Sequence, residues 1–139
     1  MKQNVPVSTI MTKNIIKLNV SDSLNKAERL FKENKIRHIP VMDGAKIIGM
    51  LSYTDLLRIS FAETIDEDDE IIDVTVYDVF KIDQVMAKNL ICIAPDSPIR
   101  DAAEILAKRE FHALPVTENN NLVGIITTTD LIRYLLDQY

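Results

Sequence analysis

The chain has 139 residues, of which 47% are apolar, so it is long enough for one hydrophobic core and short for two unrelated domains. Its net charge is only −5, no apolar run approaches the roughly 20 residues of a transmembrane helix, and the polar N-terminus does not resemble a secretory signal. We therefore expect a cytoplasmic protein with no membrane partner.

The charge is unevenly distributed along the chain. Residues 60–83 hold nine acids and one base, a net charge of −8, so the remainder carries 12 acids and 15 bases, or +3. A mild positive charge without a basic stripe argues against nucleic-acid binding and is compatible with a small anion such as phosphate.

The single cysteine limits the chemistry of the chain. Cys92 excludes an internal disulfide and a multi-cysteine zinc site. Its apolar, strand-like neighbours predict a buried structural thiol.

The chain repeats itself at an offset of 75 positions. Residues 8–59 align with residues 83–134 without a gap, and twelve of the aligned positions are identical. Two copies of one unit predict two similar halves, related by an approximate twofold axis, that bury a shared face.

Both copies predict the same elements in chain order. Residues 15–18 and 90–93 are short and β-rich, which favours strands. A helix follows in each copy, with Asp22 and Ser97 as the expected N-caps and Pro98 at the first helical position.

A strand, a turn and a second strand come next. The strands are expected at 38–42 and 47–52 and at the matching positions of the second copy. The turns 43–46 and 118–121 are rich in residues that tolerate a positive φ. Closing helices run from about 53 to 59 and from about 128 to 137. The predicted fold class is therefore α+β, with the order β-α-β-β-α twice.

This reading divides the chain into a first repeat at 1–60, an acidic connector at 61–82 and a second repeat at 83–139. Within the connector, residues 64–70 are predicted to be a solvated loop, and the run 66–70 lacks the spaced ligands of a calcium loop. Ile72, Val76, Val79 and Phe80 have helical spacing, whereas Ile72, Val74 and Val76 alternate as in a strand. We expect a short helix here.

The polar positions kept in both copies form one motif. Gly-x-x-Ser/Thr-x-x-Asp occurs at residues 49–55 and again at 124–130, and Ile39-Pro40-Val41 matches Leu114-Pro115-Val116. Met11 with Met86 and Ala27 with Ala102 match in the same register. With these residues the chain resembles a tandem pair of CBS domains, a Bateman module. The resemblance implies two β-α-β-β-α repeats packed through their sheets and a disc-like homodimer.

The motif has two interpretations. Ser52 with Asp55, and Thr127 with Asp130, have the form of a capping box, which would by itself account for both pairs. Alternatively, the helix N-terminus binds a phosphorylated ligand, and the aspartate accepts hydrogen bonds from ribose hydroxyls. The resemblance favours the second interpretation, because in CBS domains that bind adenosine nucleotides this acid holds the ribose.

The same resemblance nominates the other residues of the site. The first strands would supply apolar walls for adenine, and the prolines are expected at the rim of the sheet. Two residues precede Pro40 closely, Arg37 and His38, and His112 precedes Pro115. These three residues either are ordinary surface charge or contact the phosphates of the ligand. Since Arg37 and His38 correspond to His112 and Ala113, the first site should tolerate more ligand phosphate. The candidate ligand-binding residues are Ile15, Ile16, Arg37, His38, Pro40, Ser52, Thr54, Asp55, Leu90, Ile91, His112, Pro115, Thr127, Thr129 and Asp130.

Catalysis has little support in the sequence. There is no nucleophile elbow, no His-x-x-Glu-His and no Walker loop, so we expect no enzyme activity, no cofactor and no metal site. We expect instead a regulatory module that binds AMP, ADP or ATP in the cleft between its repeats and signals to an unknown regulated protein. NAD and S-adenosylmethionine are alternative ligands. The alternative function is a ligand-free dimerisation scaffold, and a Mg²⁺ or redox sensor is a third reading.

Overall fold

The computed structural model describes residues 4–63, 77, 79–109 and 111–139. The chain divides into two compact units, one of Ile16–Asn89 and one of Met1–Ile15 with Leu90–Tyr139. We call them the continuous unit and the discontinuous unit. They do not follow the repeat boundaries, because the leading segment of each repeat belongs to the unit that holds the body of the other repeat.

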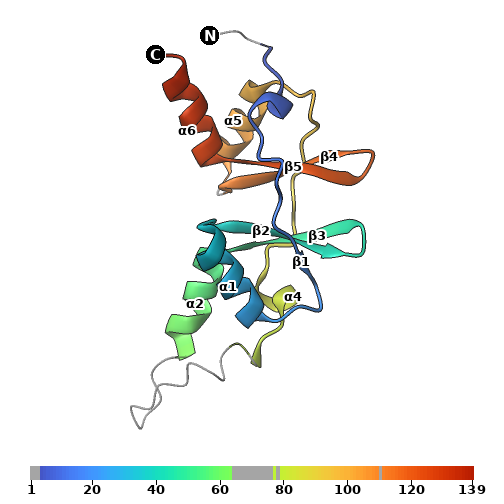
Figure 1. Ribbon diagram of the computed structural model, residues 1–139, viewed down its shortest axis with the longest axis vertical. Helices are drawn as coiled ribbons and strands as arrows, with labels where there is room; N and C mark the ends of the chain where they lie inside the picture. The colour runs from blue at the N-terminus through green and yellow to red at the C-terminus, as the bar shows by residue number, and fades with distance from the viewer. Residues whose placement is uncertain (1–3, 64–76, 78, 110) are drawn as a thin grey trace. The chain divides into compact units, whose positions relative to one another are not determined.

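The continuous unit contains a three-stranded sheet and its helices. Its elements are β1 (Leu18–Asn19), α1 (Leu24–Asn34), β2 (His38–Asp43), β3 (Lys46–Ser52), α2 (Tyr53–Glu63) and α4 (Ile82–Val85). The strand order is β1-β2-β3, with β1 parallel and β3 antiparallel to β2. The helices α1 and α2 contact each other and lie on the same side of the β2–β3 hairpin (Figure 1).

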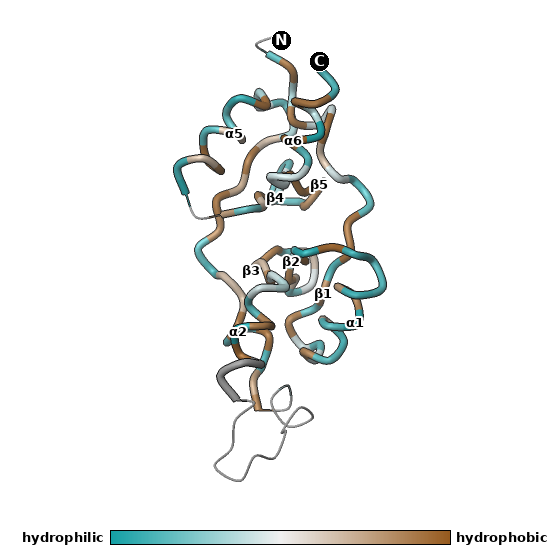
Figure 2. The backbone as a smooth tube through the Cα atoms, turned by 90° about the vertical axis from the view of Figure 1, so that its left-hand side faces the viewer, coloured by the Kyte–Doolittle hydropathy of each residue, from teal (hydrophilic) through white to brown (hydrophobic). Residues whose placement is uncertain are grey.

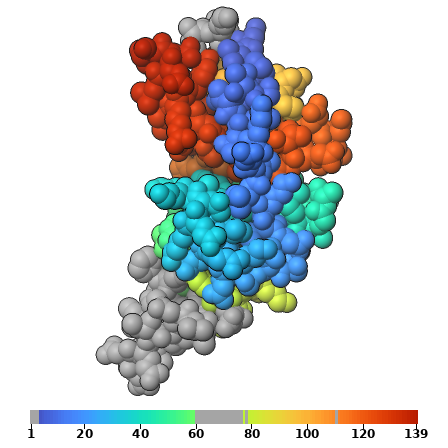
Figure 3. All heavy atoms as spheres, viewed as in Figure 1, coloured from blue at the N-terminus to red at the C-terminus, as the bar shows by residue number. Residues whose placement is uncertain are grey.

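The discontinuous unit repeats this plan around a hairpin. Its elements are the 3-10 helix η1 (Val7–Thr9), α5 (Ile99–Lys108), β4 (Ala113–Glu118), β5 (Asn121–Thr127) and α6 (Thr128–Asp137). Both α5 and α6 contact the β4–β5 hairpin and each other. In the space-filling view, the leading segment of the chain (blue) lies against the second repeat (red and orange) (Figure 3).

The predicted order of elements is confirmed in the first copy, and in the second copy for all elements except the first strand. The strands β2 and β3 begin and end 75 positions before β4 and β5, and both hairpins shift register at the same place, at Val41/Met42 and Val116/Thr117. The two turns reach a positive φ as expected, at Gly44 in one and at Asn119 and Asn120 in the other.

Three details differ from the prediction. The strands expected at 15–18 and 90–93 are shorter, since β1 is Leu18–Asn19 and the second copy forms only an isolated bridge from Ile93 to Val116. The N-caps lie one residue later, at Ser23 and Pro98. In the first copy, the Asp22 carboxylate instead accepts a hydrogen bond from the amide of Asn19. The short helices η1 and α4 were not predicted. Most of the connector, including 64–76, lies outside the described residues, although Tyr77 and Val79 are helical.

Each unit has its own hydrophobic core. Leu24, Ala27 and Phe31 of α1 pack on Ile39, Val41 and Leu51 of the hairpin in one unit, and Ala102 packs with Leu114, Val116 and Ile126 in the other. Figure 2 shows that α1 and α5 mix hydrophilic and hydrophobic residues, as expected of helices that cover a sheet with one face. Among the described helices, none is long and apolar enough to cross a bilayer.

The prediction of a buried Cys92 is wrong. Its neighbour Ile93 is buried, and adjacent residues of an extended chain point to opposite sides, so Cys92 is exposed. Partial desolvation still raises the pKa of the thiol, opposed by a hydrogen bond to Thr117.

Candidate functional site

A complete capping box begins α2. The amide of Asp55 donates to Ser52 Oγ at 3.0 Å, and the amide of Ser52 donates to Asp55 Oδ2 at 3.2 Å. The reciprocal bonds satisfy two backbone donors at the helix start, and they fix the aspartate beside the N-terminus of α2.

The same box begins α6. The amide of Asp130 donates to Thr127 Oγ1 at 3.1 Å, and the amide of Thr127 donates to Asp130 Oδ2 at 2.9 Å. The capping interpretation is thus realised in both copies, and it occupies the same carboxylate oxygen in each.

The other carboxylate oxygen meets different neighbours in the two units. Asp55 Oδ1 lies 3.6 Å from a guanidinium nitrogen of Arg58, which is largely exposed. Asp130 Oδ1 lies 3.4 Å from Thr12 Oγ1, which is equally far from Oδ2. An ionised carboxylate has about four lone-pair sites, so each aspartate keeps acceptor capacity beyond its cap.

The residues before the prolines lie beside these helix starts. The amide of Tyr53 donates to the carbonyl of Arg37 at 2.8 Å, and the amide of Thr128 donates to the carbonyl of His112 at 3.0 Å. In the hairpins, His38 pairs with Ser52 and Ala113 pairs with Thr127. The structure therefore gathers Arg37, His38, Ser52, Thr54 and Asp55 in the continuous unit, and His112, Thr127, Thr129 and Asp130 in the discontinuous unit.

The predicted site residues differ in solvent exposure. Arg37, Thr54, His112 and Thr129 are exposed, and both aspartates are partly buried. By contrast, the side chains of Pro40 and Pro115 are buried in β2 and β4, and the expectation that the prolines lie at the rim of the sheet stays a prediction. Pro40 pairs with Met50 of β3 before β1 begins to pair with β2 at Val41, so its missing N–H leaves no gap in that ladder.

The proposed apolar walls are only partly buried. Ile16 packs against the core of the continuous unit and Ile91 against that of the discontinuous unit. Ile15 and Leu90 are also partly buried and mark the boundaries between the units. These four residues lie outside the regular strands, so their arrangement around a base stays a prediction.

The sequence reasoning missed Thr12 as a neighbour of Asp130. It comes from the leading segment of the first repeat and forms a backbone bridge with Ile125, in which its amide donates at 2.8 Å. Its counterpart Ala87 forms the same bridge with Met50. The available signal was the offset of 75, which aligns a threonine with an alanine beside two identical Lys-Asn pairs.

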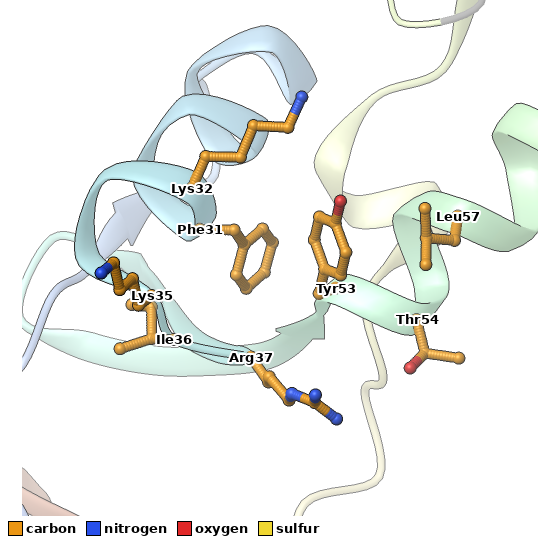
Figure 4. A pocket seen from close by; sticks show the side chains of 8 residues that line it. All are labelled: Phe31, Lys32, Lys35, Ile36, Arg37, Tyr53, Thr54 and Leu57. Atoms are coloured by element: carbon orange, nitrogen blue, oxygen red, sulfur yellow. The ribbon is translucent and has the colours of Figure 1, made fainter.

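The reasoning also missed a cavity between α1 and α2. Figure 4 shows the side chains of Arg37 and Thr54 at its edge and the rings of Phe31 and Tyr53 inside it. Among the described residues, no three His, Cys, Asp or Glu side chains are grouped as a metal site requires.

Comparison with known proteins agrees with the repeated architecture. The sequence pattern of the CBS domain family matches residues 7–62 and 76–137. An uncharacterized protein of Methanocaldococcus jannaschii, MJ1232, is 31% identical over 137 residues, which are 98% of this chain but only 41% of that protein.

Two solved structures share the fold. The CBS domain pair of protein MJ0100, in complex with 5′-methylthioadenosine and S-adenosyl-L-methionine, superposes with a TM-score of 0.79 at 22% identity and covers 97% of this chain and 98% of that one. The protein CBSX2, in complex with AMP, gives a TM-score of 0.74 at 23% identity, covering 96% of this chain and 97% of that one.

Proposed function

The chain belongs to the CBS domain family, and on that premise we propose that it is a regulatory module that binds an adenosine-containing ligand of the AMP, ADP or ATP class. The bound state would be passed to a regulated partner. Support for the ligand class comes from the two solved structures above, one with AMP and one with 5′-methylthioadenosine and S-adenosyl-L-methionine.

The observation that carries the proposal is the position of the two aspartates. Each holds a helix cap with Oδ2, which fixes the carboxylate, while Oδ1 faces side chains and not the backbone. A fixed carboxylate with spare acceptor capacity suits a ribose, whose two hydroxyls are adjacent donors. Capping and ribose binding are therefore compatible, and the cap positions the acceptor.

The neighbouring residues supply complementary groups for phosphate. Thr54 and Thr129 precede the aspartates and are exposed, and each lies in the first turn of its helix, where the dipole favours an anion. Arg37 in one unit and His112 in the other lie beside the same helix starts. Arg37 offers a planar guanidinium fork and His112 an imidazole ring, so the two units would differ in the donors that they present to phosphate.

Ligand binding at Asp130 would couple the two repeats within one unit. Thr12 belongs to the first repeat and Asp130 to the second, and their side chains are in contact. A ligand that uses both would favour the arrangement in which the leading segment is paired with β5, and a partner that senses this segment would respond.

A ligand-free scaffold is the second candidate function. It is favoured by the capping boxes, which need no ligand to account for Ser52, Asp55, Thr127 and Asp130, and by the exposed apolar residues of α6. In that case the aspartates would matter for stability alone.

Calorimetric titration of AMP into Asp55→Asn, Asp130→Asn and the double variant separates the two functions. Asparagine keeps a side-chain acceptor for the cap. Loss of charge-assisted hydrogen bonds worth about 1.5–3 kcal/mol should weaken AMP binding at the altered site by about ten- to a hundredfold. The double variant should bind no AMP in the range where the wild type is saturated.

Asp101 provides a matched control for these variants. It lies in the first turn of α5, three residues after the N-cap Pro98, which is the position that Asp55 and Asp130 occupy in their helices. Asp101→Asn should leave AMP affinity unchanged. Undiminished AMP binding in the double variant would return both aspartates to a purely structural role. Parallel titrations with ADP, ATP, NAD and S-adenosylmethionine identify the preferred ligand.

A further inference from the structure

A cavity of about 490 Å³ lies between α1 and α2 in the continuous unit (Figure 4). Phe31 and Tyr53 meet inside it edge to face, with ring centroids 5.5 Å apart and an interplanar angle of 66°. Ile36 and Leu57 complete the apolar part of the wall. The remaining lining residues are three cations and one hydroxyl: Lys32, Lys35, Arg37 and Thr54.

The cavity shares two residues with the candidate nucleotide site. Arg37 and Thr54 line the cavity, and both were assigned to that site from the sequence motif. Thr54 directly precedes Asp55, and the carbonyl of Arg37 accepts a hydrogen bond from the amide of the first residue of α2, Tyr53. A ligand anchored at Asp55 would therefore have this cavity beside it.

The charge of the lining is entirely positive. None of the eight lining residues is acidic, so the three cations give the cavity a charge of +3. Lys32 pairs with Glu28 at 3.0 Å, and this contact raises the pKa of the ammonium group, so it stays charged. Because the lysine side chain is 63% exposed, the pair is weakly held and the ammonium group remains available to an anion.

Lys35 occupies an unusual backbone position. It is the C-cap of α1 in the left-handed region, with φ of 53°, where helices commonly place glycine or asparagine. A lysine there adds a cation to the lining of the cavity at some cost in backbone energy.

The other repeat does not retain this lining. At the offset of 75, Lys32, Lys35 and Arg37 correspond to Ala107, Glu110 and His112. The cavity found on α5 is lined instead by acids and bases together, Asp101 and Glu104 with Lys108 and Arg109. The cationic cavity is thus a property of the continuous unit.

We propose that this cavity receives the phosphate chain of a nucleoside polyphosphate whose ribose is held at Asp55. The inference rests on the proposed function and names its ligand class more narrowly. A triphosphate carries about two more negative charges than a monophosphate, and those phosphates would meet Lys32 and Lys35. The continuous unit should then prefer ATP over AMP, and the discontinuous unit should not.

The test is calorimetry with ATP and with AMP in the Asp130→Asn background, which leaves the site at Asp55. The buffer contains EDTA, so that no divalent cation masks the phosphates. Lys32→Gln retains a good helix former, and Lys35→Asn retains a residue that tolerates a positive φ. The pair of substitutions should weaken ATP binding about tenfold and change AMP binding less than about twofold. Lys108→Gln, in the last turn of α5, is the control for loss of a surface charge and should affect neither ligand.

Each outcome decides one claim. Failure of the wild type to bind either nucleotide overturns the proposed function and this inference with it. AMP binding with unchanged ATP affinity in the lysine variant overturns this inference alone. Equal losses for ATP and AMP overturn it as well, because they indicate general damage to the site. The inference is also overturned if the two lysine substitutions weaken ATP binding equally in the Asp55→Asn background, where only the site at Asp130 remains.

Discussion

The side chain of Met86 lies directly over Gly49, so that a Cβ at position 49 would be 2.8 Å from Met86 Cγ and 2.9 Å from Met86 Cε. Gly124 and Met11 repeat this contact in the other unit, at 2.9 Å from Cγ. In each case the methionine of one repeat packs on the glycine of the other repeat's motif. The contact holds the leading segment of each repeat in its unit.

Gly49→Ala should therefore destabilise the protein. Real side chains essentially never approach this closely, and Met86 is only 8% exposed, so its side chain has little room to move. Overpacking of this kind costs about 1–3 kcal/mol, which urea unfolding would measure as a lower midpoint. Gly124→Ala should cost less, because Met11 is more exposed and able to shift.

The partner of Gly49 is identified by a double-mutant cycle. If Met86 causes the clash, then Gly49→Ala should be harmless or nearly so in a Met86→Ala background, whose own cavity cost is counted separately. Additive effects of the two substitutions would contradict this account.

Much of this fold was predictable from the sequence, because each local pattern occurs in both copies and supports the same assignment twice. The strand at 38–43 is short and contains a proline, but its copy at 113–118 has the same pattern followed by the same turn. The capping pairs were predictable for the same reason, since Ser52 and Asp55 recur as Thr127 and Asp130.

Long-range contacts were not predictable in this way. Hydrophobic periodicity indicates which residues face a core, but it does not indicate that Met86 packs on Gly49, 37 positions earlier. The contact of Thr12 with Asp130 spans 118 positions and depends on that same exchange of leading segments. The cavity beside Arg37 depends on the gap between two helices, which no residue pattern describes.

Tyr77→Phe should lower stability at neutral pH more than at acidic pH. The Tyr77 hydroxyl donates a hydrogen bond to Glu28 Oε2, and this is the main reason why the pKa of Glu28 is lowered; the bond to Lys32 adds to it. A carboxyl group with a lowered folded-state pKa stabilises the protein above its unfolded-state pKa, near 4.5, and that contribution is lost as the pH falls through the folded-state value.

The expected difference between wild type and Tyr77→Phe is about 1 kcal/mol at pH 7 by urea unfolding. It should shrink as the pH falls below 4.5, where Glu28 of the unfolded chain becomes protonated, and vanish once the pH has passed the lower folded-state pKa of Glu28. Tyr134→Phe, on α6, serves as the control for loss of a tyrosine hydroxyl. A difference that stays constant between pH 7 and pH 3.5 would show that the ionised carboxylate of Glu28 is not the partner.

The outer face of α6 should mediate self-association. Ile132, Leu135 and Leu136 are exposed, by 52%, 44% and 66%, and their spacing places them on one stripe of the helix, while Tyr139, 96% exposed, follows the end of α6. A contiguous apolar stripe favours an isologous contact between two copies. Sedimentation equilibrium at high micromolar concentration should show a dimer of the 15.8 kDa chain, and Ile132→Glu with Leu136→Glu should give a monomer. Gln138→Glu, which adds charge without removing an apolar group, should leave the dimer intact. A wild-type monomer would refute the prediction.

One difference between the two candidate sites is a hydroxyl group, which Thr12 has and Ala87, at the matching position of the other unit, lacks. Both residues form the same backbone bridge: the amide of Thr12 donates to Ile125 at 2.8 Å, and that of Ala87 to Met50 at 2.9 Å. Only Thr12 adds a hydroxyl, 3.4 Å from both oxygens of Asp130. This distance is long for a hydrogen bond between oxygens, so the hydroxyl contributes little to stability and acts mainly by orienting the carboxylate.

Thr12→Val keeps the β-branched shape and removes the donor, and Ala87→Thr adds the donor to the other unit. With one weak hydrogen bond at stake, Thr12→Val should lower AMP affinity about two- to fivefold in the Asp55→Asn background, where only Asp130 binds. Ala87→Thr should raise AMP affinity by a similar factor in the Asp130→Asn background. The melting temperature should barely change in either, because the backbone bridges are kept. An effect of Thr12→Val that is equally large when Asp130 is replaced would show that the hydroxyl does not act through this carboxylate.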